Sequence, residues 1–260
     1  MEKKLILKRE NFDIPAVLSV PNKVESCPAV ILCHGTGSEK GEVGRMFKRL
    51  SQKLAKRGIA SISLDFACCG ERIDEEEPVT FMGQVEDTKA AYDALLNEPC
   101  VDRDRIGILG FSQGARIMTC FAYKYGKVKA LVSWSGTCHN SKGVYSSWFD
   151  TYREEADKNG FVNLPLDWRE PLRMSKAWFD EIEATNPMDM LKSFDKPLLA
   201  VGGTRDEIVP TEHITEIAEA AGGKAVVIED ADHTFNVLTG DQSVSKKVIE
   251  MTTDWLCDNL

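Results

Sequence analysis

Several features that would place a protein in a special class are missing from this sequence. The first ten residues, MEKKLILKRE, contain no apolar core of a signal peptide, and no apolar run approaches the 18 residues of a membrane-spanning helix. Positive charge is in deficit, with 32 Lys and Arg against 41 Asp and Glu. A basic surface is what nucleic acids and anionic membranes attract, so we expect neither as a partner.

The eight cysteines also lack a recognisable spacing. They occupy positions 27, 33, 68, 69, 100, 120, 138 and 257, and no C-x-x-C pair occurs among them. This excludes the usual spacings of thiol-redox sites and zinc knuckles. Cys33 and Cys120 stand in apolar contexts, where a free thiol behaves as a small hydrophobic side chain. We therefore predict a cytoplasmic protein, in a reducing compartment, with no metal and no cofactor.

Apolar, β-branched runs alternate with segments of helical period along most of the chain. Strands are expected at 4–8, 14–20, 29–33, 59–66, 105–109, 129–134, 196–201 and 224–229, and helices at 43–56, 81–95, 113–125, 211–221 and near the carboxyl end. This alternation predicts an α/β fold with a mostly parallel sheet, whose first two strands form an antiparallel edge pair. Roughly 60 residues between 134 and 196 show no strand pattern, which indicates an insertion.

A candidate nucleophile stands where the strand 105–109 meets the next helix. The sequence there is Gly110-Phe111-Ser112-Gln113-Gly114, a G-x-S-x-G motif. A tight strand-to-helix turn needs small residues at both glycine positions and exposes the serine hydroxyl. The alternative interpretation is a glycine-rich turn in which Ser112 only caps the helix.

A nucleophilic serine needs a base, and the chain has four histidines. His34 belongs to a glycine-rich loop with another role, His139 lies in the insertion, and His213 falls inside an expected helix. His233 follows the strand 224–229, and loops at the carboxyl ends of parallel strands present catalytic groups. We predict His233 as the base, against the alternative of an ordinary loop histidine.

The carboxylate that orients the base should follow a strand end between the serine and the histidine. The strand 196–201 leads into GGTRDEIVP, in which Asp206 is the natural candidate and Glu207 its nearest competitor. Asp232 is adjacent to His233 and cannot readily reach the far nitrogen of its ring. The remaining alternative is that Asp206 only caps a turn.

Two backbone donors should stabilise the oxyanion of an acyl-transfer reaction. One is the N–H of Gln113, at the start of the helix after the turn. The other is expected from His34-Gly35-Thr36-Gly37-Ser38, whose glycines allow the backbone to approach a substrate closely, with the N–H of Thr36 as donor. An anion-binding nest or a flexible turn is the alternative for this loop.

Four motifs then stand in order along the chain: HGTGS, GFSQGA, GGTRDEIVP and DADHTF. Together they resemble the α/β-hydrolase superfamily, and within it the feruloyl/cinnamoyl esterase and dienelactone-hydrolase-like group. The resemblance covers nearly the whole chain. It implies an α/β-hydrolase fold, with a mostly parallel central sheet flanked by helices, as one domain over 1–260 with an inserted cap at 137–190.

The same resemblance implies Ser112, Asp206 and His233 as a catalytic triad, and Thr36 and Gln113 as the oxyanion donors. The sequence differs from this group at two points. Dienelactone hydrolases use a cysteine nucleophile, where this chain has Ser112. The segment LDFACCGER replaces the glycine-rich stretch of the esterases and brings Arg72 near the expected mouth of the site.

The insertion is rich in aromatic residues, holding eight of the 21 in the chain. Most of these are expected to form the core of the cap, and two or three to face the substrate. Our candidates for substrate binding are Arg72, Trp134, Tyr145 and Trp148. They favour a small or medium acyl group of apolar or aromatic character.

These observations predict a serine carboxylesterase that acts on a small-molecule ester through an acyl-enzyme intermediate, with a feruloyl esterase as one form of it. A peptidase or thioesterase with the same triad is the first alternative. A non-catalytic ligand binder of the same fold is the second. A dimer formed through the cap or an edge strand is left open, because no sequence signature specifies one.

Overall fold

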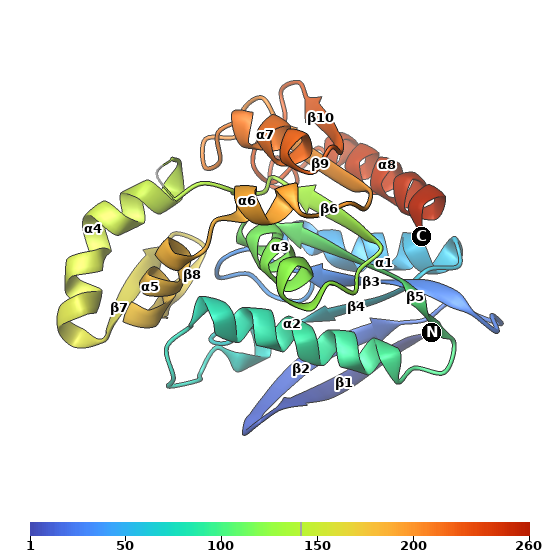
Figure 1. The fold of residues 1–260 in the computed structure, drawn as a ribbon, viewed down its shortest axis with the longest axis horizontal. Coiled ribbons are helices and arrows are strands. Elements are labelled where there is room, and N and C mark those ends of the chain that lie inside the picture. Colours follow the sequence, from blue (N-terminus) through green and yellow to red (C-terminus); the bar gives the residue numbers. More distant parts are fainter. Residues whose placement is uncertain (141) are drawn as a thin grey trace.

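The computed structural model describes residues 1–140 and 142–260, and a sheet of eight strands forms its centre. The strands are β1 (Glu2–Arg9), β2 (Phe12–Ser19), β3 (Cys27–Cys33), β4 (Ala60–Leu64), β5 (Val101–Phe111), β6 (Ala130–Trp134), β9 (Leu198–Gly203) and β10 (Lys224–Ile228). Their order is β1-β2-β4-β3-β5-β6-β9-β10 (Figure 1). β2 is antiparallel to both β1 and β4, and the other neighbours are parallel. The predicted α/β fold with a mostly parallel sheet is confirmed.

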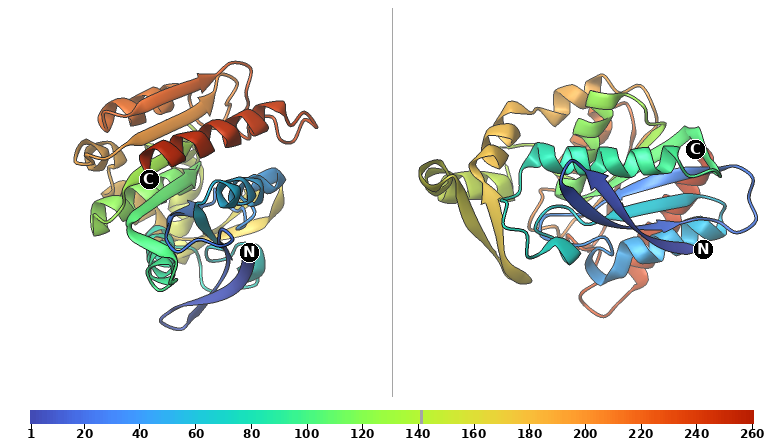
Figure 2. Two further views of the ribbon diagram at one scale, coloured as in Figure 1. Left: turned by 90° about the vertical axis from the view of Figure 1, so that its right-hand side faces the viewer. Right: turned by 90° about the horizontal axis from the view of Figure 1, so that it is seen from below.

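Helices cover both faces of the sheet (Figure 2). On one face lie α1 (Met46–Lys56) and α8 (Ser243–Asn259); on the other lie α2 (Phe81–Leu96), α3 (Gln113–Tyr125), α6 (Pro187–Lys192) and α7 (Glu212–Ala220). Side chains of each strand alternate between the two layers, so that on β3 Leu32 packs toward α1 and α8 and Ile31 toward the opposite layer. None of the helices in the described ranges is long and apolar enough to cross a membrane.

Two short 3-10 turns lie in the loops at the carboxyl ends of β3 and β4. They are η1 (Val43–Arg45) and η2 (Gly70–Arg72). The helix expected at 43–56 therefore begins three residues later, because Gly44 and Arg45 have positive φ angles of 56° and 57°. Met46, the first residue of α1, is already fully buried.

The insertion between β6 and β9 contains elements of both kinds. These are α4 (Val144–Asn159), β7 (Phe161–Leu166), β8 (Arg169–Ser175) and α5 (Lys176–Ala184), which Figure 1 shows together at one end of the molecule. The expectation that this region has no strand pattern was wrong. β7 and β8 form an antiparallel pair in which Val162, Leu164, Leu172 and Met174 are buried. The prolines at 165 and 171 interrupt the apolar run, although the period of two is present.

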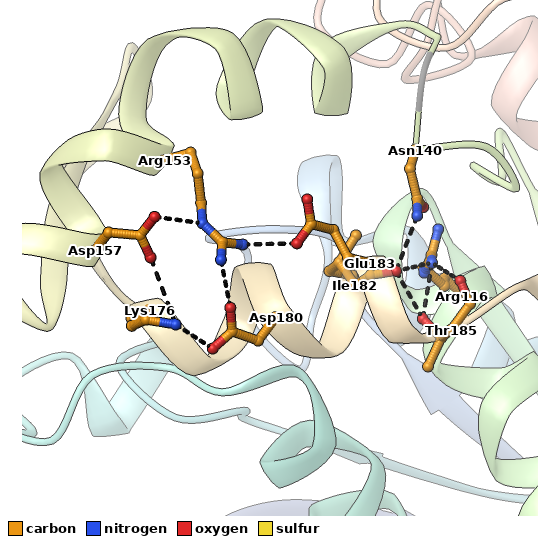
Figure 3. A network of polar contacts seen from close by, with 9 residues as sticks. All are labelled: Arg116, Asn140, Arg153, Asp157, Lys176, Asp180, Ile182, Glu183 and Thr185. Atoms are coloured by element: carbon orange, nitrogen blue, oxygen red, sulfur yellow. Dashed lines mark hydrogen bonds and ion pairs between the residues drawn. The ribbon is translucent and has the colours of Figure 1, made fainter.

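We call the insertion from α4 to α5 the cap. Polar contacts join its elements to one another and to the core (Figure 3). Within the cap, Arg153 on α4 pairs with Asp180 and Glu183 on α5, the latter at 2.9 Å. At the boundary, Nη2 of Arg116 on α3 donates to the carbonyls of Ile182 and Thr185 at the end of α5, both at 2.8 Å. The cap therefore has internal ion pairs, and hydrogen bonds join it to the helix that follows Ser112.

Candidate active site

Ser112 lies in a sharp turn between β5 and α3. β5 ends at Phe111 and α3 begins at Gln113, so Ser112 alone joins the strand to the helix. Its backbone has φ 54° and ψ −120°, a conformation that non-glycine residues rarely adopt. The N–H of Ser112 donates to the carbonyl of Trp134 at 2.8 Å and holds the turn against β6. The side chain is partly exposed, as an attacking group must be.

Gly110 and Gly114 have no room for a side chain. A Cβ atom on Gly110 would lie 2.2 Å from the carbonyl group of Gly114, and one on Gly114 would lie 2.0 Å from the carbonyl oxygen of Cys33. Backbone atoms cannot move aside as the end of a flexible side chain can. The spacing of the motif therefore reflects the contact of α3 with β5 and β3, which is the steric reason for its glycines.

His233 and Asp206 come from the loops that follow β10 and β9. Nδ1 of His233 lies 2.7 Å from Oδ2 of Asp206, and the two side chains are 10% and 2% exposed. Oδ1 of Asp206 accepts from the N–H groups of Ile208 and Val209 at 2.9 and 2.8 Å. A carboxylate only accepts, so neutral His233 carries its proton on Nδ1 and leaves Nε2 able to accept a proton.

His233 lies beside the turn that carries Ser112. The ring centroids of His233 and Phe111, the residue before Ser112, are 5.1 Å apart. The hydroxyl of Ser135, just after β6, donates to the carbonyl of His233 at 2.9 Å. The Ser112 hydroxyl forms no hydrogen bond with the described residues. Such bonds often form only when substrate is bound, so the arrangement is compatible with proton transfer from Ser112 to His233.

The competing candidates for base and carboxylate have other surroundings. His34 is buried, and both of its ring nitrogens contact backbone groups. The rings of His139 and His213 pack against each other with centroids 5.0 Å apart. Glu207 is exposed, and the carboxylate of Asp232 accepts from backbone N–H groups in its own loop. Among the described residues, Asp206 and His233 form the one direct contact of a carboxylate and a histidine beside Ser112.

Thr36 and Gln113 lie together at the start of α3. The Thr36 hydroxyl donates to Oε1 of Gln113 at 2.8 Å, and Nε2 of Gln113 donates to Oε1 of Gln84 at 2.6 Å. In the part of the chain that the structure describes, the backbone N–H groups of Thr36 and Gln113 donate no hydrogen bond. Two free donors beside Ser112 are what an oxyanion requires. Gln84, which fixes the side chain of Gln113 from α2, belongs to no motif that would predict this contact.

Two buried carboxylates hold the loop of Thr36 in place. Glu42 accepts from the N–H of Gly35 at 2.8 Å and from the hydroxyl of Ser38 at 2.6 Å. Asp65, at the end of β4, accepts from the N–H of Lys40 at 2.7 Å and also pairs with its ammonium group. We did not predict either role, because both depend on contacts that no local sequence pattern encodes.

Arg72 is enclosed by charges of its own chain. Its guanidinium group pairs with Asp87 at 2.7 Å and with Glu75 at 2.6 Å, and its side chain is 2% exposed. Asp87 in turn pairs with Arg9 on β1 at 2.6 Å. These pairs offset the cost of burying the charge. Because the guanidinium group is already paired and buried, we propose no contact of Arg72 with the substrate.

The predicted aromatic contacts also lie inside the protein. Trp134 is fully buried on the face covered by α1 and α8, where its indole N–H donates to the hydroxyl of Thr252 at 2.9 Å. Tyr145 is buried in the cap between Trp148 and Trp178, with ring centroids 5.6 and 5.4 Å away. Because both side chains are buried, we propose no substrate contact for Trp134 or Tyr145. Trp148 is partly exposed and remains a prediction.

The tip of the β7–β8 hairpin contacts the loop of Thr36 directly. A Cβ atom on Gly37 would lie 2.5 Å from Cδ1 of Leu166, 3.1 Å from Cδ of Arg169 and 3.5 Å from Nε1 of Trp168. Nη1 of Arg169 also donates to the carbonyl of Cys68 at 2.8 Å. These residues were not among our site predictions, because the hairpin itself was not expected.

Comparison with known proteins agrees with this architecture. The model of the alpha/beta hydrolase family matches residues 30–244, from β3 into α8. The chain belongs to the alpha/beta hydrolase family. The turn of Ser112 and the loops after β9 and β10 thus lie within the matched part of the chain.

The chain has relatives that are named esterases. It is 32% identical over 143 residues to esterase FrsA of Vibrio cholerae, a match that covers 53% of this chain and 32% of that one. The chain thus spans about a third of the length of such relatives. Its fold is also shared by solved structures. Est1E of Butyrivibrio proteoclasticus with ferulic acid has a TM-score of 0.76 at 20% identity, covering 98% of both chains. Dienelactone hydrolase of Anabaena variabilis has a TM-score of 0.65 at 17% identity, covering 100% of this chain and 98% of that one.

Proposed function

We propose that this hydrolase is a serine esterase with Ser112, His233 and Asp206 as its triad. The observation that carries the proposal is the contact of His233 with Asp206 beside the strained turn of Ser112. A serine in such a turn is exposed to attack a carbonyl group, and a histidine held by a carboxylate is the base that such a serine needs. The esterases among the relatives support the same reaction class.

In the proposed reaction, Nε2 of His233 removes the proton of Ser112 as Oγ attacks the ester carbonyl. The N–H groups of Thr36 and Gln113 stabilise the oxyanion of the tetrahedral intermediate. His233 returns the proton to the leaving alcohol, which gives an acyl-enzyme. Water then attacks the acyl-enzyme, again with His233 as base, and the acid departs as Ser112 regains its proton. Asp206 holds the imidazolium in both steps.

For the substrate we propose an ester with a small or medium acyl group of apolar or aromatic character. The support comes from the tip of the β7–β8 hairpin, where Leu166 and Trp168 contact Gly37 in the loop of Thr36. Trp168 is 58% exposed, so its ring is available to a ligand. Trp178 and Phe179, in contrast, are fully buried and form the core of the cap. Est1E, which has the same fold, binds ferulic acid, an aromatic acid of this kind.

The proposal is tested with p-nitrophenyl acetate and butyrate and with methyl ferulate. Wild-type protein should hydrolyse at least one of them, and Ser112→Ala should reduce kcat by about 10⁴-fold or more. Ser147→Ala, which changes an exposed serine of α4, is the matched control and should leave kcat unchanged. Equal activity in Ser112→Ala would refute the assignment of the nucleophile.

The alternatives are separated by two further measurements. Acyl-CoA thioesters and aminoacyl naphthylamides, assayed beside the esters, distinguish a thioesterase or peptidase by the highest kcat/KM. A fluorophosphonate probe should label wild-type protein at Ser112 and leave Ser112→Ala unlabelled. A non-catalytic binder would remain unlabelled in both forms.

A further inference from the structure

A second cluster of reactive side chains lies outside the proposed triad. Cys138 and His139 are in the loop between β6 and the cap, and His213 and Glu216 are on α7. The spacing of three residues places His213 and Glu216 on one face of the helix. One ligand atom from each of the four residues lies within 4.8 Å of the other three.

These donors are the kind that a zinc ion binds. A thiolate, two imidazole nitrogens and a carboxylate oxygen suit zinc, whereas magnesium and calcium prefer oxygen ligands alone. In a tetrahedral zinc site the ligand atoms are separated by about 3.3–3.8 Å, as bond lengths of about 2.0–2.3 Å require. To reach that size, the closest pair, His139 and Glu216 at 2.5 Å, would have to move apart, and the widest separations, of up to 4.8 Å, would have to close.

The surroundings of His213 point to a missing ligand. Its side chain is fully buried; its Nδ1 accepts from the N–H of Cys138 at 3.4 Å, and its Nε2 has no hydrogen-bond partner among the described residues. Metal binding at Nε2 would move the ring proton to Nδ1 and so replace this long contact. Leaving a buried polar group unpaired costs about 1–3 kcal/mol. The Cys138 side chain is 2% exposed, and its thiol makes no hydrogen bond with the part of the chain that the structure describes. Two inner donors are thus buried without the partners that buried groups normally have.

The other two donors form an opening to solvent. Nε2 of His139 contacts Oε2 of Glu216 at 2.5 Å, and the side chains are 28% and 32% exposed. Lys142 approaches the other carboxylate oxygen of Glu216, Oε1, at 3.5 Å, and so leaves Oε2 to the cluster. An ion can therefore enter on this side while Cys138 and His213 bind it from within.

We propose that Cys138, His139, His213 and Glu216 bind a zinc ion. Cys138 would bind as a thiolate and release its proton to solvent, so the pair of electrons on sulfur forms the bond to the metal. The ion would join the loop that enters the cap to α7 of the core. Its role is then to fix the start of the cap, independently of the reaction proposed for Ser112.

Zinc binding to the full-length protein is the direct test. Protein stripped of metal by a chelator and dialysed is titrated with zinc in competition with a chromophoric chelator. We expect one equivalent to bind with a dissociation constant in the micromolar range or tighter. Cys138→Ser and Glu216→Gln should each weaken binding by at least about tenfold, the loss that even an outer-shell partner can cause. Cys120→Ser removes another buried thiol and should bind as the wild type does.

Cobalt adds a readout that depends on the thiolate. Cobalt bound to wild-type protein should show thiolate-to-metal charge-transfer absorption, which Cys138→Ser should lose. The melting temperature of each variant in chelator checks that it is folded, and the partly exposed Glu216→Gln keeps the test valid if Cys138→Ser is not. The proposal is overturned by a zinc stoichiometry near zero, or by binding that is no weaker in Cys138→Ser and Glu216→Gln than in Cys120→Ser. Ester hydrolysis is not part of either readout, so these outcomes leave the proposed function untouched.

Discussion

The turn of Ser112 should store backbone strain that a stability measurement can detect. At φ 54° and ψ −120°, a residue with a Cβ atom is expected to cost about 1–3 kcal/mol, and glycine avoids this cost. Compared with alanine, glycine lowers the free energy of unfolding by about 0.4–1 kcal/mol, because its unfolded chain has more freedom. The missing half-buried carbon lowers it by less than about 0.8 kcal/mol more. The balance predicts that Ser112→Gly is about 1 kcal/mol more stable than Ser112→Ala.

Urea denaturation of the two inactive variants measures this difference, and melting temperatures should differ by about 2–4 °C in the same direction. The control pair is Ser147→Gly and Ser147→Ala on the exposed face of α4. There the order should reverse, with alanine about 1 kcal/mol more stable because it favours a helix. If alanine were also the more stable residue at 112, the reasoning from backbone strain would be refuted.

Three more predictions follow from the same geometry. Asp206→Asn should lower kcat by about 10⁴-fold, because an amide can donate to Nδ1 of His233 and favour the wrong tautomer; esterase assays with a loss below tenfold would contradict this. Gly114→Ala should destabilise the fold by more than about 3 kcal/mol in urea denaturation, since its Cβ would lie 2.0 Å from the Cys33 carbonyl oxygen, and a value below 1 kcal/mol would exclude that steric explanation. Burial lowers the pKa of His34 from its ordinary value of 6.5, so below about pH 6.5 the unfolded chain binds a proton that the folded chain does not. Stability should then fall with decreasing pH by up to about 1.4 kcal/mol per unit, and less steeply in His34→Gln; equal slopes in urea denaturation would contradict the assignment.

The sequence was informative where a local pattern has one steric solution. The alternation of strands and helices predicted the layers of the fold. An apolar strand must lie inside the sheet, and the apolar stripe of a helix must pack against that sheet. Gly110 and Gly114 marked the turn of Ser112 because their neighbours leave no space for a Cβ atom. With so few histidines in the chain, elimination was enough to single out His233, which indeed contacts Asp206.

Features that depend on distant segments were not accessible in this way. Glu42 holds the loop of Thr36 and Gln84 holds the side chain of Gln113, and neither residue belongs to a motif. The environment of Trp134, a predicted substrate contact, also depends on packing across the sheet. On a strand, successive side chains face opposite sides of the sheet, and Trp134 faces the layer of α1 and α8, where its indole N–H donates to Thr252.

Arg116 shows why the cap and the turn of Ser112 should be considered together. It lies one helical turn after Ser112 on α3, and its side chain is fully buried with no carboxylate partner in the described ranges 1–140 and 142–260. Its charge is instead balanced by the carbonyls at the end of α5 and by the rings of Phe81 and Tyr145, each with its centroid 5.8 Å from Cζ. A buried cation held only by dipoles and aromatic faces is costly, and burial accordingly lowers the pKa of Arg116. Such a contact is favourable only when α5 is docked on α3. The position of the cap is therefore linked to the helix that begins at the proposed nucleophile.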